Sequence, residues 1–206
     1  MKTKGIILFG DSVFFGYGAS DKNKGCGRIL RNLCRNVQIL IKARNNDSTR
    51  SGLDRIKGDV LTRENYSHVF ILFGNNDCRL VDKLTPICTI EEFRNNLMKI
   101  TLLIKNVGKN PILCNLQPIN DYLCYQRLSY MREYLNPNIT PDAWHKKYSD
   151  EIVLLADKIE VPIVDIEKKL RSTSDAIYKD GLHPNDKGHM VIARLLFDEI
   201  KKQGLA

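Results

Sequence analysis

Gly5-Ile6-Ile7-Leu8-Phe9-Gly10-Asp11-Ser12 is the stretch around which the rest of the chain is organised. Its four apolar residues, bounded by glycines, are typical of a strand buried on both faces of a sheet. Gly10 permits a tight turn, so Ser12 is expected at the carboxyl end of that strand, where open α/β sheets bind ligands. The tripeptide Gly-Asp-Ser alone is also typical of a turn followed by a helix cap. A catalytic interpretation therefore needs a base, an acid and oxyanion donors elsewhere in the chain.

The composition is that of an ordinary globular protein. The 206 residues are 43% hydrophobic and 27% charged, which predicts a single domain over residues 1–206. No apolar run approaches the ~20 residues that span a bilayer, and the run from Ile6 to Phe9 is too short for a signal peptide. We therefore expect a cytoplasmic protein without a stable membrane anchor.

The charge distribution and the cysteines indicate which ligands the protein could bind. The net charge is +8, and residues 1–60 hold 12 Lys and Arg against 5 Asp and Glu. This excess has two interpretations, a solvated basic face or attraction of an anionic substrate. No nucleic-acid-binding module is recognisable. None of the six cysteines forms a C-x-x-C pair, and the four histidines show no metal-ligand spacing, so we expect reduced thiols, no metal and no cofactor.

Strand-length apolar runs alternate with helical periodicities along the chain. This βα alternation predicts a parallel sheet of five strands in a three-layer α/β/α doubly wound fold, with strand order 2-1-3-4-5. The predicted strands after the first are Val37–Ile41, Val69–Phe73, Pro111–Leu116 and Val161–Val164. The predicted helices are Gly27–Arg35, a short one carrying Leu53 and Ile56, one behind a Thr89/Glu92 capping box, one begun by Thr140 and Pro141, and one capped by Asn185 or Asp186.

Chemically useful side chains follow the strands at their carboxyl ends, which meet at one edge of a parallel sheet. Ser12 is the candidate nucleophile, and His183 is the candidate base that would accept its proton. Asp180, three residues earlier, can fold back onto the imidazole Nδ1–H and fix the tautomer. The side-chain amide of Asn76 and the backbone N–H groups of Ser12 and Asn46 are the candidate oxyanion hole.

In these motifs the chain resembles the SGNH hydrolases, the subgroup of GDSL esterases and lipases. Gly10-Asp11-Ser12 is similar to the first block of that family, with Val13 where Leu is usual. The stretches 74–77 (Gly-Asn-Asn-Asp) and 180–184 (Asp-Gly-Leu-His-Pro) match its G-x-N-D and D-x-x-H-P blocks. The resemblance implies a flavodoxin-like sheet, a Ser-His-Asp triad and no metal.

One block departs from the family. Where the second block commonly has an oxyanion-hole glycine, this chain has Asn46. That role uses a backbone N–H, which Asn also has, and Asn tolerates left-handed backbone angles better than most residues. Gly52 is the alternative equivalent, and it would leave Asn46 without a role.

The resulting functional hypothesis is a serine esterase that cleaves a carboxylic ester through an acyl-serine intermediate. Its partner would be a small-molecule ester such as an acyl ester, a lysophospholipid or an acetylated sugar. A thioesterase or an acyltransferase could use the same triad. A non-catalytic flavodoxin-like binding module is disfavoured, because no Gly-x-Gly-x-x-Gly or P-loop follows a strand.

The remaining candidates are expected to be structural. Asp11 is expected to brace its turn and Asp77 to order the loop behind Asn76, while His68, His145 and His189 are placed outside the site. Trp144 and Tyr148 are expected to pack in the core. Residues 117–139 are predicted to be irregular, and their tyrosines suggest a lid or pocket wall.

Overall fold

The computed structural model describes residues 5–205, and its centre is a sheet of five parallel strands. The spatial order is β2-β1-β3-β6-β7, which is the predicted order 2-1-3-4-5 when only these strands are numbered. The strands are β1 (Gly5–Gly10), β2 (Ile39–Ala43), β3 (Tyr66–Leu72), β6 (Asn110–Cys114) and β7 (Ile163–Val164). The predicted doubly wound α/β/α fold is confirmed.

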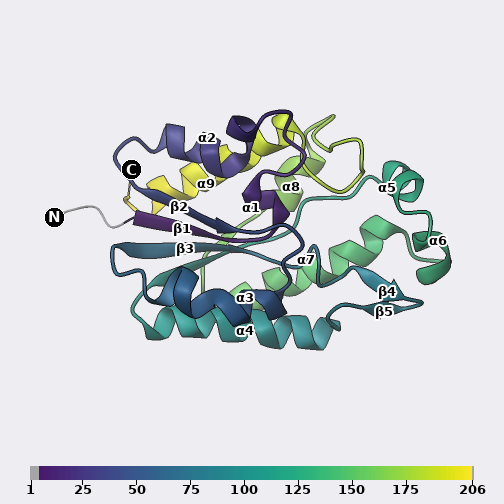
Figure 1. Cartoon of the computed structure of the whole chain (residues 1–206), viewed down its shortest axis with the longest axis horizontal. Coiled ribbons are helices and arrows are strands. Elements are labelled where there is room, and N and C mark those ends of the chain that lie inside the picture. Colours follow the sequence, from purple (N-terminus) through teal and green to yellow (C-terminus); the bar gives the residue numbers. More distant parts are fainter. Residues whose placement is uncertain (1–4, 206) are drawn as a thin grey trace.

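Helices cover both faces of this sheet (Figure 1). On one face, α2 (Cys26–Leu33) packs against α9 (Asp186–Lys202), and α8 (Ile166–Arg171) contacts α9. On the other, α4 (Ile90–Asn106) packs between α3 (Thr49–Ile56) and α7 (Pro141–Lys158). A π-helical turn at Lys57–Leu61 extends α3, and a 3-10 turn at Lys22–Lys24 precedes α2.

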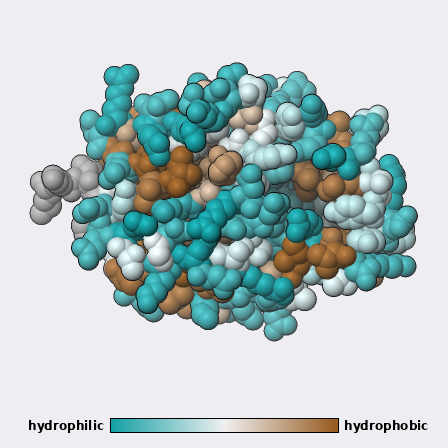
Figure 2. All heavy atoms as spheres, in the orientation of Figure 1, coloured by the Kyte–Doolittle hydropathy of each residue, from teal (hydrophilic) through white to brown (hydrophobic). Residues whose placement is uncertain are grey.

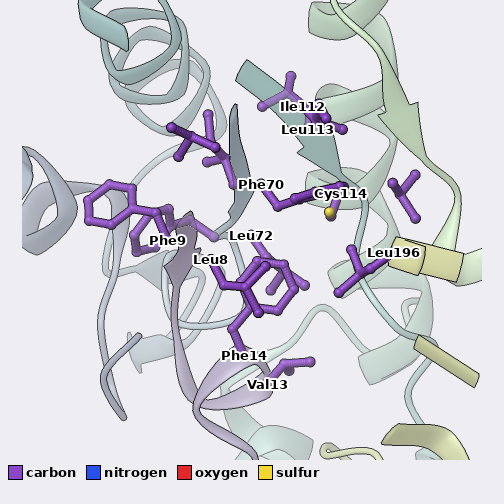
Figure 3. Close-up of a cluster of buried hydrophobic side chains, with 14 of the residues drawn as sticks. Leu8, Phe9, Val13, Phe14, Phe70, Leu72, Ile112, Leu113, Cys114 and Leu196 are labelled. Carbon is purple, nitrogen blue, oxygen red and sulfur yellow. The ribbon is translucent and has the colours of Figure 1, made fainter. Parts of the chain in front are cut away.

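Strand β1 is the centre of the core because it pairs with β2 on one side and β3 on the other. All six of its residues are buried, as the apolar run predicts. Its side chains meet those of β3, β6 and α9, including Leu8, Phe70, Cys114 and Leu196 (Figure 3). Gly10 is required where β1 ends, since a Cβ there would lie 2.4 Å from the carbonyl oxygen of Leu72 on β3.

Local capping explains where the long helices begin. The Thr89 side chain accepts from the Glu92 N–H at α4, the Thr140 side chain accepts from the Ala143 N–H at α7, and Asn185 caps α9. The Glu92 carboxylate binds Arg50 on α3.

The prediction that residues 117–139 are irregular is wrong, because α5 (Asp121–Arg127) and α6 (Met131–Tyr134) form there. An antiparallel hairpin of β4 (Leu80–Asp82) and β5 (Thr85–Pro86), also not predicted, lies beside α6 and is joined to it by the Leu84 N–H to Tyr134 O bond. We call this hairpin and residues 117–139 together the cap. Figure 1 shows the cap beyond the carboxyl ends of the central strands.

Hydrophilic side chains cover most of the face in Figure 2. All six cysteines are buried and none forms a disulfide. No helix between residues 5 and 205 has the length and hydrophobicity to cross a membrane. The cytoplasmic location expected from the sequence stays a prediction.

Candidate active site

Ser12 begins α1 (Ser12–Phe15), the four-residue helix that follows β1 directly. Asp11 caps this helix by accepting from the Val13 N–H at 3.0 Å, so it braces the turn. The Ser12 side chain is 6% exposed and lines a cavity of about 410 Å³.

A continuous chain of hydrogen bonds links the three predicted triad residues. Ser12 Oγ lies 2.9 Å from His183 Nε2, and His183 Nδ1 lies 2.7 Å from Asp180 Oδ2. The carboxylate fixes Nδ1 as the protonated nitrogen, which leaves Nε2 to accept the serine proton. The structure thus brings together residues that lie 171 positions apart in the chain.

The turn of residues 180–184 orients the imidazole. The second carboxylate oxygen of Asp180 accepts from the backbone N–H groups of Leu182, at 2.9 Å, and His183, at 3.0 Å. Burial alone would raise the pKa of Asp180, but the hydrogen bonds from His183 and Leu182 outweigh burial and lower it. Asp180 is therefore ionised at neutral pH and accepts the hydrogen bond from His183 Nδ1 as a carboxylate.

The Tyr17–Gly18 segment packs against His183. The rings of Tyr17 and His183 have centroids 4.4 Å apart. His189 fixes this segment, because its Nδ1 accepts from the Cys26 N–H and its Nε2 donates to the Tyr17 carbonyl at 2.8 Å. His189 was expected to lie outside the site, yet it holds a residue that touches the candidate base His183.

The candidate oxyanion donors line the same cavity as Ser12. Asn46 has φ of +63°, the left-handed conformation that its side chain tolerates. The Asn76 amide nitrogen donates one hydrogen to the Asp47 carbonyl at 2.9 Å, which leaves its second hydrogen for another acceptor. Within residues 5–205, nothing accepts from the backbone N–H of Ser12 or of Asn46.

Gly52, the alternative to Asn46, occupies a different environment. It lies inside α3, where its N–H donates to the Ser48 carbonyl at 2.9 Å and its Cα faces Phe73. It is absent from the cavity lining described above. The geometry therefore favours Asn46 as the backbone donor.

Two buried ionisable residues, Asp77 and Arg55, fix the loops that carry these donors. The Asp77 carboxylate accepts from the backbone N–H and the hydroxyl of Thr49, so it joins the β3 loop to α3, as its predicted ordering role requires. Arg55 donates to the Asp47 carboxylate at 2.6 Å and to the Gly10 carbonyl at 3.0 Å, and it stacks over Phe9. Arg55 thus holds the Asn46 loop against the strand that presents Ser12.

A buried polar network adjoins the turn that carries the candidate nucleophile Ser12, and the sequence analysis did not predict it. The Asn75 amide donates to Asp11 at 2.9 Å, and Asn75 Oδ1 accepts from Gln117 at 2.9 Å and from His145 at 2.8 Å. Gln117 also donates to the Leu182 carbonyl at 2.9 Å, which joins the Asn75 loop to the turn that carries His183.

Burial shifts the pKa values of two groups in this network, His145 and Asp11. It lowers the pKa of His145 to about 4, so the ring is neutral at pH 7. It raises the pKa of Asp11 to about 7, against the opposing effect of the Val13 and Asn75 hydrogen bonds. The prediction that His145 lies outside the site is wrong, because it lines the cavity and binds Asn75. His68, which bonds Ser67 and Asn110 near the other end of β3, does lie outside.

The cap forms one wall of the cavity. Cys124, Leu128, Tyr130 and Met131 from residues 117–139 line it, as the tyrosine-rich sequence suggested. Trp144 also lines the cavity, and its indole N–H donates to the Cys78 carbonyl at 2.7 Å. The sequence predicted that Trp144 packs in the core, but the structure places it in the cavity wall as well. Tyr148, by contrast, is fully buried and bonds the Cys88 carbonyl.

Comparison with known proteins identifies the family of this chain. The family model for GDSL-like Lipase/Acylhydrolase matches residues 6–196, nearly the whole chain. The chain therefore belongs to the GDSL-like lipase/acylhydrolase family, and the SGNH hydrolase resemblance seen in its sequence is confirmed.

Individual relatives are distant in sequence. The uncharacterized lipoprotein YqeF of Bacillus subtilis (strain 168) is 27% identical over 213 residues, covering 95% of this chain and 87% of that protein. The lipase/acylhydrolase from Enterococcus faecalis superposes with a TM-score of 0.77 at 23% identity, over 97% of this chain and 96% of the other. Axe2, an acetylxylan esterase from Geobacillus stearothermophilus, gives 0.74 at 20% identity over the same shares. These structures share the fold.

Proposed function

We propose that this protein is a serine esterase that cleaves a small-molecule carboxylic ester through an acyl-enzyme on Ser12. The observation that supports this most is the hydrogen-bonded chain from Ser12 Oγ through both ring nitrogens of His183 to Asp180. Membership of a lipase/acylhydrolase family supports the same class of reaction.

In the proposed acylation step, Ser12 Oγ attacks the ester carbonyl carbon while His183 Nε2 takes the serine proton. Asp180 keeps Nδ1–H directed at itself and stabilises the positive charge that develops on the ring. The carbonyl oxygen becomes an oxyanion, for which the backbone N–H groups of Ser12 and Asn46 and the second amide hydrogen of Asn76 are the proposed donors.

The tetrahedral intermediate then collapses. The carbon–oxygen bond to the alcohol breaks, and His183 gives its proton to the leaving alkoxide. Water enters, His183 accepts a water proton, and the hydroxide attacks the acyl carbon. Collapse of the second intermediate releases the carboxylic acid and returns the proton to Ser12 Oγ.

The proposal is tested by hydrolysis of p-nitrophenyl esters of increasing acyl length, with acetylated sugars and lysophospholipids measured beside them. Ser12→Ala should lower kcat by several orders of magnitude, on the scale of ~10⁶. His183→Ala should cost nearly as much, and the double variant should be little worse than either, because the triad acts as a unit.

Ser172→Ala is the matched control. This serine is exposed at the end of α8 and donates to the Lys169 carbonyl, so its removal should leave kcat unchanged. A Ser12→Ala variant that keeps more than a few per cent of the wild-type rate would refute the proposed nucleophile.

A further inference from the structure

Two arginines on the cap side of the cavity have no charged partner. Arg79 directly precedes β4, and Arg127 ends α5, so they reach the cavity from separate segments. Both residues are exposed while they line the cavity, which places them at its mouth. Within the described part of the chain, neither guanidinium forms an ion pair or a hydrogen bond.

Most other arginines among the described residues have a side-chain partner. Several guanidinium groups pair with carboxylates, and another stacks on an aromatic ring: Arg44 with Asp59, Arg50 with Glu92, Arg94 with Glu151, Arg171 with Asp142, and Arg132 over Tyr125. Among the described residues Arg28, Arg35 and Arg194 have no such partner, and Arg31 and Arg63 bond only backbone carbonyls. None of these five arginines lines the cavity.

The cavity offers these two cations nothing negative to bind. Among the described residues that line it, Asp180 is the one carboxylate, and its oxygens already accept from His183 and Leu182. Burial raises the pKa of the Tyr130 phenol, and the positive charge of Arg79 partly opposes that rise. The lining therefore has an excess of positive charge on the cap side.

Apolar side chains accompany the arginines there. Leu128, Tyr130, Met131 and Trp144 line the cavity, and they pack in one apolar cluster with Leu80 of the hairpin. A ligand that fits this lining has an apolar portion and an anionic group. Guanidinium groups bind carboxylates and phosphates with paired N–H donors, which makes those two groups the natural ligands.

We infer that Arg79 and Arg127 form an anion subsite, so that the preferred ester carries a carboxylate or phosphate group away from the ester bond. This inference rests on the proposed esterase function and specifies its substrate class. The sequence hinted at an anionic substrate through the basic residues of positions 1–60, but the cations that face the cavity come from a different part of the chain.

The test compares hydrolysis of charged and neutral esters that are otherwise alike. One pair carries the charge on the acyl side: the mono-p-nitrophenyl ester of adipic acid against p-nitrophenyl hexanoate. The second pair carries it on the alcohol side: a monoacylglycerol phosphate against the monoacylglycerol of the same chain. The pair in which the charged ester is hydrolysed faster than the neutral one identifies whether the acyl side or the alcohol side of the substrate carries the anion.

Arg79→Ala and Arg127→Ala should each lower kcat/KM for the charged member of one pair by about 10-fold, because each removes a charge-assisted hydrogen bond. The neutral member should be unaffected. Arg132→Ala is the control, since Arg132 lies on the cap but outside the cavity lining. Raising the salt concentration from about 0.05 M to about 0.5 M should lower kcat/KM for the charged ester and leave kcat/KM for the neutral ester unchanged.

Equal losses on charged and neutral esters, or no loss on either pair, would overturn the anion subsite while the esterase function stands. Wild-type protein that hydrolyses none of the four esters would instead refute the proposed function, and the subsite with it.

Discussion

Gly18→Ala should misplace the catalytic base without changing a residue that touches substrate. Gly18 has φ of +91°, and a Cβ added there would lie 2.3 Å from the Pro184 carbonyl oxygen and 3.0 Å from His183 Cβ. Ordinary carbon–oxygen contacts are about 3.3 Å or longer, so one of the two segments must move by about 1 Å. We expect the segment of His183 and Pro184 to move, because His189 holds the Tyr17 segment in place, and the Ser12–His183 bond of 2.9 Å would then exceed hydrogen-bonding distance. A displacement of this size should lower kcat/KM by about 10²-fold.

The assay is kcat/KM on one soluble p-nitrophenyl ester together with the free energy of unfolding. Gly108→Ala separates strain from displacement, because Gly108 also has a positive φ, +72°, but nothing lies within 4 Å of its added Cβ. That control should lose about 1–2 kcal/mol of stability and no activity. A folded Gly18→Ala variant with kcat/KM within about two-fold of the wild-type value would refute the reasoning.

Three further predictions follow from the site. Asn76→Ala should lower kcat by roughly 10²–10³, since it removes a side-chain donor, whereas Asn46→Gly should cost little because the backbone N–H is kept; a collapse of activity in Asn46→Gly would contradict the assigned role. His145 is neutral in the folded protein down to a pKa of about 4 but protonates near 6.5 when unfolded, so stability should fall by about 2 kcal/mol from pH 7 to pH 5 on its account. The His145→Gln variant can still donate to Asn75 but has no imidazole to protonate, so its free energy of unfolding in urea should lack this loss between pH 7 and pH 5. The same loss in the variant as in the wild type would contradict the lowered pKa of His145. Asp11→Asn would direct an amide N–H₂ at the Asn75 N–H₂, and should destabilise the protein by about 1–3 kcal/mol in the same assay; an unchanged unfolding midpoint would contradict the hydrogen-bond assignment.

The sequence was sufficient to predict the central strands and the positions of the residues that directly follow them. Strand β1 is an unbroken apolar run, and Ser12 comes immediately after it, so topology alone placed the serine at the correct edge. Asp180 and His183 are three residues apart, a spacing at which a turn joins them without help from the rest of the fold.

The supporting contacts could not be predicted because they join distant segments through side chains. Asn75 and His145 are 70 residues apart, and Gln117 and Leu182 are 65 apart. A single His or Gln on such a segment carries no signal of its partner. Arg55 likewise carries no signal in the sequence that it joins the Asp47 loop to the end of β1.

The cap was missed for a different reason. Its strands have three and two residues and α6 has four, which is too short for a periodic pattern. The hairpin turn also contains Leu84 with φ of +55°, where glycine or asparagine would have indicated a turn. Helix α5 depends on Asn120, whose side chain accepts from the Leu123 N–H, and on contacts with α7.

The central claim is that His183 activates Ser12 as a nucleophile, and covalent labelling tests it most directly. A fluorophosphonate should phosphonylate wild-type protein at Ser12 alone, as peptide mass spectrometry would locate. Labelling should be absent in Ser12→Ala and at least about 10²-fold slower in His183→Ala, because the serine would have lost its base. Labelling that persists in Ser12→Ala, or that proceeds at the wild-type rate in His183→Ala, would contradict the claim.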